Sequence, residues 1–405
     1  MSRPLDGIRV LEVAQFWFVP AAGAILADWG AEVIKVEHPV RGDAQRGLAA
    51  AGFGFREGGV DFMMQQSNRG KRSVGIDIAT AEGLELLYRL AERSDVFLTN
   101  FLPSARARLR IDVEHVRARN PRIVYVRGSG QGPDGAESDR GGYDATAFWF
   151  RGAVANGLTA PGAAAPVMQR PAFGDSVGAV ALAAGVAAAL FQRERGGDPS
   201  VVDVSLLGTA MWTLAPDIVA SRLLPPGKSM PVPDRAAAFN PLANSYRTSD
   251  GRWLVLMALQ PDRYWEEICR AIGRDDLLGD PRFADARSRF QNRRECVAEL
   301  DRTFAGEPLA VWRERLRSLE TPWAPMQLPG ELHDDPQAAA NGYLAQVPGG
   351  DAGHFGLVAS PVQFDQQPVA LEPSPELSQH TEEVLLDLGL DWDELAKLRE
   401  VGAIG

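Results

Sequence analysis

The chain has 405 residues, of which 45% are hydrophobic and 23% charged, and its formal net charge is −11. At roughly 150 residues per domain, this length predicts two or three domains with a sizeable buried core. The acidic balance offers no basic surface for nucleic acids or anionic membranes, so we expect neither as a partner.

The first 205 residues alternate short β-branched runs with helical patterns. Helices are predicted at 21–30 and at 80–95, the second with Thr80 as its N-cap. Strands are predicted at 8–13, 32–37, 73–78, 96–100, 122–127 and 201–205. Strands that alternate with helices predict an α/β fold, in which helices cover both faces of a Rossmann-like parallel sheet.

Two long segments between these strands are predicted as loops. Residues 38–72 contain the sequences RGD and NRGKRS, and residues 128–142 are rich in glycine. Because long loops that follow strands are more often functional than idle, we expect part of a binding site in them.

An apolar run at 177–191 follows Asp175. It is shorter than the roughly 20 residues of a membrane span, so we predict a helix that is buried on all sides. Asp175 has two interpretations: its oxygen caps the helix, or its carboxylate attacks an activated acyl group and forms an anhydride. A helix N-terminus favours the ionised carboxylate, and its free N–H groups can stabilise an oxyanion.

The second half of the chain is predicted to contain a smaller α+β module. A helical stretch at 206–224 and a proline-rich linker at 225–235 precede it. The module begins with a hairpin at 246–259. Helices follow near 261–272, 286–304 and 308–319, and two more are predicted within 380–402.

The sequence lacks the motifs of several common kinds of binding and catalytic site. Phe16, Trp17 and Phe18 occupy the turn where a dinucleotide-binding G-x-G-x-x-G loop needs small residues. The five histidines are scattered, so no metal site is predicted. No lysine lies in an apolar stretch that would lower its pKa, and no G-x-S-x-G elbow is present. Cys269 and Cys296 form no disulfide framework, and the N-terminus has no signal-peptide pattern, so we expect a soluble cytoplasmic protein.

Sequence fragments along nearly the whole length carry a family resemblance. They are, in chain order, PLDGIRVLEVAQ, LADWGAEVIKVE, NRGKRSVGIDI, TNFLPSARARL, NPRIVYVRGSGQGPDG, GGYDATAFW, GDSVGAVALAAGVAAAL, YRTSDGRWLVLMALQPDRYW, DDPQAAANGYL and QHTEEVLLDLGL. In this order they resemble the family III CoA-transferases, the group that includes formyl-CoA transferase, the carnitine CoA-transferases and the α-methylacyl-CoA racemases.

The resemblance implies a large domain built from both chain ends, a small domain between them, and a homodimer of interlocked rings. We therefore expect residues 1–205 to form the N-terminal part of the large domain and 206–235 a helix and linker. Residues 236–320 would form the small domain, and 321–405 a return linker and the C-terminal part of the large domain.

The resemblance also implies the reaction and its residues. Asp175 would attack an acyl-CoA to give an acyl-aspartyl anhydride, then an aspartyl-CoA thioester from which a carboxylic acid takes the CoA. Coenzyme A would be a substrate, with no tightly bound cofactor. His38, Lys71 and Arg72 would lie near its ADP or 3′-phosphate, and the remaining CoA-binding residues would be Phe16, Trp17, Asn100, Phe101, Arg106, Arg108 and Tyr143.

Racemases of this family resemble the transferases but use a His–Asp pair supported by a glutamate. Here Tyr143 stands in the histidine position and Gln260 in the glutamate position, and a phenol with a pKa near 10 exchanges α-protons poorly. These departures favour a transferase, with racemase-type proton transfer and a catalytically silent CoA-binding protein as the alternatives.

The resemblance does not identify the acyl group that the enzyme transfers. Formyl-CoA transferases carry a glutamine where this chain has Trp17, and a run of glycines in the small domain that is absent here. Phe16, Trp17, Phe18, Phe148 and Trp149 either pack in the core or line the pocket. In the second case we expect an apolar or aromatic acyl group.

Overall fold

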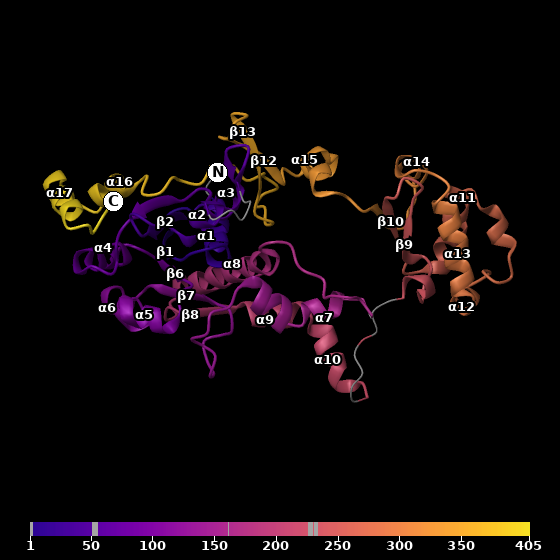
Figure 1. The fold of residues 1–405 in the computed structure, drawn as a ribbon, viewed down its shortest axis with the longest axis horizontal. Helices are drawn as coiled ribbons and strands as arrows, with labels where there is room; N and C mark the ends of the chain where they lie inside the picture. The colour runs from indigo at the N-terminus through magenta and orange to yellow at the C-terminus, as the bar shows by residue number, and fades with distance from the viewer. Residues whose placement is uncertain (1–2, 51–55, 161, 226–229, 231–233) are drawn as a thin grey trace. The chain divides into compact units, whose positions relative to one another are not determined.

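The computed structural model describes residues 3–50, 56–160, 162–225, 230 and 234–405. They form two compact units, one made of Met1–Met230 with Pro336–Gly405 and the other of Pro231–Asp335. In the first unit the C-terminal helices lie beside the N-terminal part of the chain (Figure 1). Of the predicted linker, residues 226–229 and 231–233 lie outside the described residues.

A six-stranded sheet forms the centre of the first unit, in the order β5-β2-β1-β6-β7-β8 with every neighbouring pair parallel. The strands are β1 (Arg9–Val13), β2 (Glu32–Glu37), β5 (Arg72–Gly75), β6 (Val96–Thr99), β7 (Val124–Ser129) and β8 (Val201–Ser205). The prediction of an α/β fold with a parallel sheet is confirmed.

Side chains that alternate along the strands supply two cores, because successive residues of a strand point to opposite faces. Val10 of β1 packs in one core with α1 (Phe18–Asp28) and α8 (Phe173–Glu194). Leu11 packs in the other core with α4 (Ala81–Glu92), α6 (Val113–Arg119) and the C-terminal helices α16 (Thr381–Asp387) and α17 (Trp392–Glu400).

Helix α8 differs from the prediction that it is buried on all sides. Leu182, Val186 and Leu190 are buried, whereas Val177 and Phe191 on the opposite face are exposed. Among the described helices, α8 alone is long and apolar enough to cross a membrane. It packs against α1 in the core of the first unit, as core helices of similar composition do.

The segment 38–72, predicted as a loop, contains short regular elements. They are α2 (Ala44–Ala50), β3 (Arg56–Glu57), β4 (Val60–Asp61) and α3 (Phe62–Asn68). Elements this short show no hydrophobic period in the sequence, which is why the pattern missed them. Residues 130–142, by contrast, contain no helix or strand.

The remaining elements of the first unit surround the sheet or follow it in the chain. They are α5 (Pro103–Leu109), the π-helix η1 (Asp144–Arg151), α7 (Val154–Leu158), α9 (Leu206–Thr213), α10 (Ala215–Leu223), α15 (Pro336–Ala340) and the hairpin of β12 (Leu344–Pro348) and β13 (His354–Val358).

The second unit is an antiparallel sheet covered by helices. Its strands are β9 (Ala243–Arg247), β10 (Trp253–Met257) and β11 (Trp323–Pro325). Its helices are η2 (Arg235–Ala237), α11 (Pro261–Ala271), η3 (Asp275–Gly279), α12 (Ala286–Gln291), α13 (Arg293–Phe304), α14 (Leu309–Arg315) and η4 (Pro329–Asp334). Two sequence boundaries need correction: β11 extends this unit beyond residue 320, and the helix predicted at 286–304 is interrupted at Asn292.

Candidate active site

A cavity of about 370 Å³ lies where the strand order of the large sheet reverses. The chain leaves β1 toward β2 on one side, and β6 lies on the other, so the loops after β1 and β6 diverge and leave a crevice at the carboxyl ends of the strands. This is where open parallel α/β sheets bind their ligands. The lining residues are Gln15, Phe16, Phe18, Asn100, Phe101, Leu102, Pro103, Ala105, Arg106, Arg127, Gly128, Ser129, Gly130, Gly132, Pro133, Ser138, Arg140, Gly141, Gly142, Tyr143, Asp175, Asp203 and Leu206.

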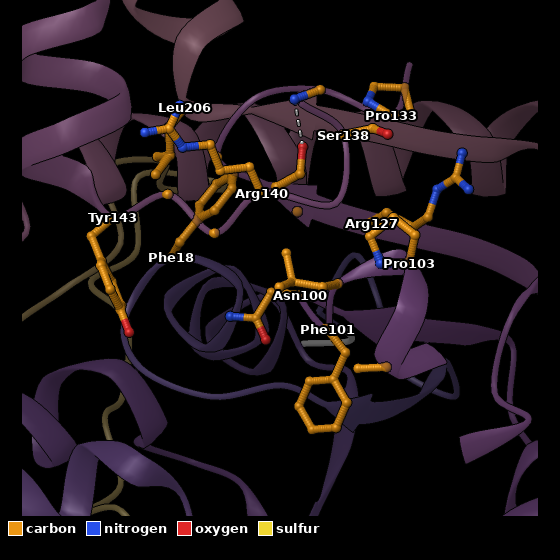
Figure 2. Close-up of a pocket in the computed structure, with 18 of the residues that line it drawn as sticks. Phe18, Asn100, Phe101, Pro103, Arg127, Pro133, Ser138, Arg140, Tyr143 and Leu206 are labelled. Atoms are coloured by element: carbon orange, nitrogen blue, oxygen red, sulfur yellow. Dashed lines mark hydrogen bonds between the residues drawn. The ribbon is translucent and has the colours of Figure 1, made fainter. Parts of the chain in front are cut away.

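Asn100 joins the two loops that form the crevice. Its Oδ1 accepts the N–H of Gln15 at 3.0 Å, and its Nδ2 donates to the carbonyl of Gln15 at 2.6 Å. Next to this clamp, the rings of Phe16 and Tyr143 meet edge to face with centroids 5.4 Å apart. Tyr143 and Arg127 lie on opposite sides of Asn100 (Figure 2), so the cavity is elongated from an aromatic end to a charged end.

Asp175 reaches this cavity from the first turn of α8, whose N-cap is Ala172. Asp175 is not the cap that the sequence suggested. The carboxylate of Asp144, at the start of η1, takes that place and accepts the N–H of Gly174 at 3.1 Å with both oxygens. Within the described part of the chain, no hydrogen-bond donor reaches the carboxylate of Asp175.

Two further details define this helix start. A Cβ on residue 174 would overlap the ring of Phe148 and the carboxylate of Asp144, so the close packing requires glycine. The expected free N–H groups are occupied: Gly174 donates to Asp144, and Ser176 donates its N–H to the carbonyl of Ala172 at 2.9 Å. The amides of this turn are therefore not available to an oxyanion.

Burial and, to a smaller extent, the neighbouring carboxylate of Asp144 together raise the pKa of Asp175 to about 8. Burial also raises the pKa of Asp144, although hydrogen bonds from Gly174 and other amides oppose the rise. Asp175 is therefore a poorly solvated carboxylate, held without hydrogen bonds at the wall of a cavity. A carboxylate in this state is a stronger nucleophile than one in water.

The charged end of the cavity was not predicted. Arg127 binds Asp203 through two hydrogen bonds, from Nε at 2.7 Å and from Nη2 at 2.8 Å. Ser138 also lines the cavity, and Arg140 lies on the other side, over Phe18 (Figure 2). Arg127 and Asp203 stand on neighbouring strands β7 and β8, and this position at the ligand-binding edge of the predicted sheet was the signal that could have found them.

The structure brings six of the predicted site residues together at this cavity: Phe16, Asn100, Phe101, Arg106, Tyr143 and Asp175. Trp17 lies just beside it, and its indole Nε1 donates to the Oγ of Ser176 at 3.1 Å. Arg106 is largely buried, and its guanidinium is bound to the carbonyl of Phe101 and to Asp112.

The other four predicted residues do not line the cavity. Lys71 is buried in the core, where its ammonium donates to Glu12, Asn68 and the carbonyl of Pro20. Direct contact with a nucleotide phosphate does not fit this position. Burial lowers the pKa of Lys71 to about 7, although this lysine does not stand in an apolar stretch of the sequence, where such a shift was looked for.

The three remaining cationic or basic residues take other positions. Arg72 pairs with Glu32 and the C-terminal helix α16, and Arg108 is exposed on α5. His38 accepts the N–H of Val40 and of Arg41 with its Nδ1. Their contacts with CoA stay predictions.

The aromatic residues divide between core and cavity. Phe16 and Phe18 line the cavity, whereas Phe148 and Trp149 are buried in the core beside α1 and α8. Among the described residues no group of three or more His, Cys, Asp or Glu side chains could hold a metal ion.

Comparison with known proteins assigns the chain to a family. The model of CoA-transferase family III matches residues 5–381, and the chain belongs to this family. It is 31% identical to (R)-2-hydroxy-4-methylpentanoate CoA-transferase of Clostridioides difficile, over 98% of each chain. It is 30% identical to cinnamoyl-CoA:phenyllactate CoA-transferase of Clostridium sporogenes, over 98% of this chain and 96% of the relative. The crystal structure of a CaiB/BaiF family protein from Brucella suis superposes with a TM-score of 0.83 at 27% identity and covers 96% of this chain and 100% of the other.

Within that family the chain is a CoA-transferase, an enzyme whose substrates are CoA thioesters and carboxylic acids.

Proposed function

We propose that the protein transfers CoA from an acyl-CoA to a carboxylic acid through covalent intermediates on Asp175. The observation that carries this proposal is the state of the Asp175 side chain. It faces this cavity at the sheet edge without a hydrogen bond in the described chain, because Asp144 caps α8 in its place.

The reaction proceeds in two exchanges. An oxygen of Asp175 attacks the thioester carbonyl, the C–S bond breaks, and an acyl-aspartyl anhydride and CoA thiolate form. The thiolate then attacks the aspartyl carbonyl, which releases the donor acid and leaves CoA on Asp175 as a thioester. The acceptor acid repeats both steps in reverse order and leaves as the new acyl-CoA.

The acyl group that fits this cavity is apolar or aromatic. Phe16, Phe18 and Tyr143 form the end of the cavity beside Asp175, and the relatives named above include enzymes of a branched and an aromatic acid. The charged end, with Arg127 and Ser138, suits the polar part of CoA.

Mass spectrometry after incubation with a panel of acyl-CoAs tests this proposal. With hydroxylamine, we expect a hydroxamate on the peptide that carries Asp175, with larger yields from branched or aromatic donors than from succinyl or oxalyl donors. Deuterium from D₂O should not enter the α-carbon of the substrate. Deuterium uptake without an adduct would assign proton transfer instead, the alternative in which Tyr143 or another group exchanges the proton.

We further propose that the enzyme acts as a homodimer. Helix α10 has no buried residue in the described chain, and Trp212 and Leu223 on α9 and α10 are 82% and 81% exposed. Exposed apolar side chains gathered on consecutive helices indicate a protein–protein contact. Light scattering during gel filtration should give twice the mass of the chain, and a monomer at micromolar concentration would contradict the proposal.

A further inference from the structure

The tripeptide Gln15-Phe16-Trp17, between β1 and α1, is held by a side chain at each of its residues. Asn100 binds the backbone of Gln15 on both sides, and the indole of Trp17 donates to Ser176. The third holder is Asp43, whose Oδ1 accepts the N–H of Phe16 at 2.8 Å. These holders come from the loops after β6 and β2 and from α8, so the tripeptide is fixed from three directions.

Phe16 needs such a holder because its backbone is strained. Its φ is +66°, in the left-handed region that side chains with a Cβ adopt at a cost of about 1–2 kcal/mol. A bulky residue stays in this region only where its surroundings impose it, and such residues cluster at functional sites. Here the strained residue puts its ring at the cavity wall against Tyr143.

Asp43 is itself rigidly placed. Its side chain is only 1% exposed, and its Oδ1 accepts a second N–H from Gln45 at 2.8 Å. Its Oδ2 forms an ion pair with the buried ammonium of Lys35 at 2.8 Å, and its own N–H donates to Glu37 at 2.9 Å.

Lys35 fixes the other oxygen of Asp43 in turn. Its ammonium also binds Glu12 at 2.9 Å and the carbonyl of Ala14 at 2.8 Å. Burial opposes its charge, but the carboxylates of Asp43 and Glu12 raise the pKa of Lys35 above its ordinary value, so it stays cationic. Each oxygen of Asp43 therefore has its own partners: Oδ2 contacts the ammonium of Lys35, and Oδ1 accepts the backbone N–H groups of Phe16 and Gln45.

We propose that Asp43, the aspartate of the RGD sequence, is a positioning residue that sets the acyl-group specificity of the enzyme. It holds Phe16 in the left-handed conformation and thereby fixes the aromatic wall beside Asp175. The inference rests on the proposed transferase function, and it explains why a buried ion pair lies directly beneath this wall.

The variant Asp43→Asn tests the inference because it keeps the shape of the side chain. Asparagine has an NH₂ group in place of one carboxylate oxygen. In one orientation this NH₂ points at the ammonium of Lys35, and in the other at the N–H of Phe16, so a donor meets a donor in both. We expect kcat/KM for a branched or aromatic acyl-CoA to fall about 10- to 100-fold, the equivalent of one unsatisfied buried group. The loss for acetyl-CoA, which has little contact with the wall, should be several-fold smaller.

Asp28→Asn is the matched control. Asp28 is also buried, pairs with Arg69 at 2.7 Å and accepts the N–H of Ser360 at 3.1 Å, but it does not touch the tripeptide. It should lower stability in chemical denaturation as Asp43→Asn does and leave the ratio of kcat/KM between the two donors unchanged. An equal change of that ratio in both variants would overturn the inference.

A double substitution separates positioning from stability. Glycine adopts positive φ without strain, so Phe16→Gly removes the need for a holder. Asp43→Asn should therefore cost at most about twofold in kcat/KM when added to Phe16→Gly. A full loss in both backgrounds would show that Asp43 does not act through Phe16.

Amide hydrogen exchange tests the same contact without the reaction. The peptide that contains Phe16 should exchange faster in Asp43→Asn and unchanged in Asp28→Asn. Unchanged exchange in both would overturn the inference, whereas a wild-type enzyme that forms no adduct on Asp175 would overturn only the proposed transferase function.

Discussion

Replacing Asp175 with asparagine is expected to lower kcat by about 10⁴-fold or more, because the covalent nucleophile is lost and no other described carboxylate at the cavity is free to replace it. Asp203, which also lines the cavity, is bound to Arg127 by two hydrogen bonds. The measurement is steady-state transfer with the best acyl donor, together with the hydroxamate assay. Asp198→Asn, at an exposed position beyond α8, serves as the control with unchanged activity.

The same substitution is expected to stabilise the fold at high pH. Folding raises the pKa of Asp175 from 3.8 to about 8, so between these values the folded state holds a proton that the unfolded state has released. Stability therefore falls as the pH rises through this range, and asparagine avoids that loss. At pH 8 we expect a gain of about 1–3 kcal/mol, a figure reduced because the residue keeps partial contact with solvent.

Thermal denaturation at pH 5 and pH 8 checks the sign. The melting temperature of Asp175→Asn should exceed that of the wild type more at pH 8 than at pH 5. A destabilised variant at pH 8, or a variant that keeps a tenth of the activity, would contradict the assignment of Asp175 as a desolvated nucleophile.

Much of this architecture follows from local pattern. The six strands of the large sheet are short β-branched runs between helical segments, and their alternation alone requires parallel pairing. The same logic places the cavity at the carboxyl ends of the strands, where Phe16, Asn100 and Phe101 follow β1 and β6. The apolar run at 177–191 predicted the helix itself, but α8 begins at Phe173, before the residue that the sequence suggested as its cap.

What could not be predicted depends on contacts between distant residues. Asp144 caps α8 from 30 positions away, which frees Asp175 from the capping role that its local sequence suggests. Lys71 stands in a basic run that looks like a surface loop, yet its ammonium meets Glu12, 59 positions earlier. Arg127 and Asp203 pair across 76 positions because β7 and β8 are neighbours. No local pattern encodes these three contacts, although the predicted strands could have placed Arg127 and Asp203, without their pairing, at the site.

Asp144→Asn is expected to shift the pH dependence of the reaction. The ionised form of Asp175 is the nucleophile, so kcat/KM of the wild type should rise about tenfold per pH unit and level off near pH 8. Asparagine at position 144 keeps an oxygen that accepts the N–H of Gly174, but it removes the negative charge that raises the pKa of Asp175.

The midpoint of the profile should therefore move to lower pH, which raises the ionised fraction and lowers the intrinsic nucleophilicity of the carboxylate. It should stay above the ordinary value for aspartate, because burial is the larger cause of the shift and the substitution leaves it in place. Profiles of kcat/KM between pH 5 and 9 measure the direction of the shift and the final midpoint. Asp139→Asn, on the glycine-rich loop, is the control and should leave the midpoint unchanged. An unmoved midpoint in Asp144→Asn would mean that the two carboxyl groups do not interact, and that desolvation alone holds Asp175 in its protonated form.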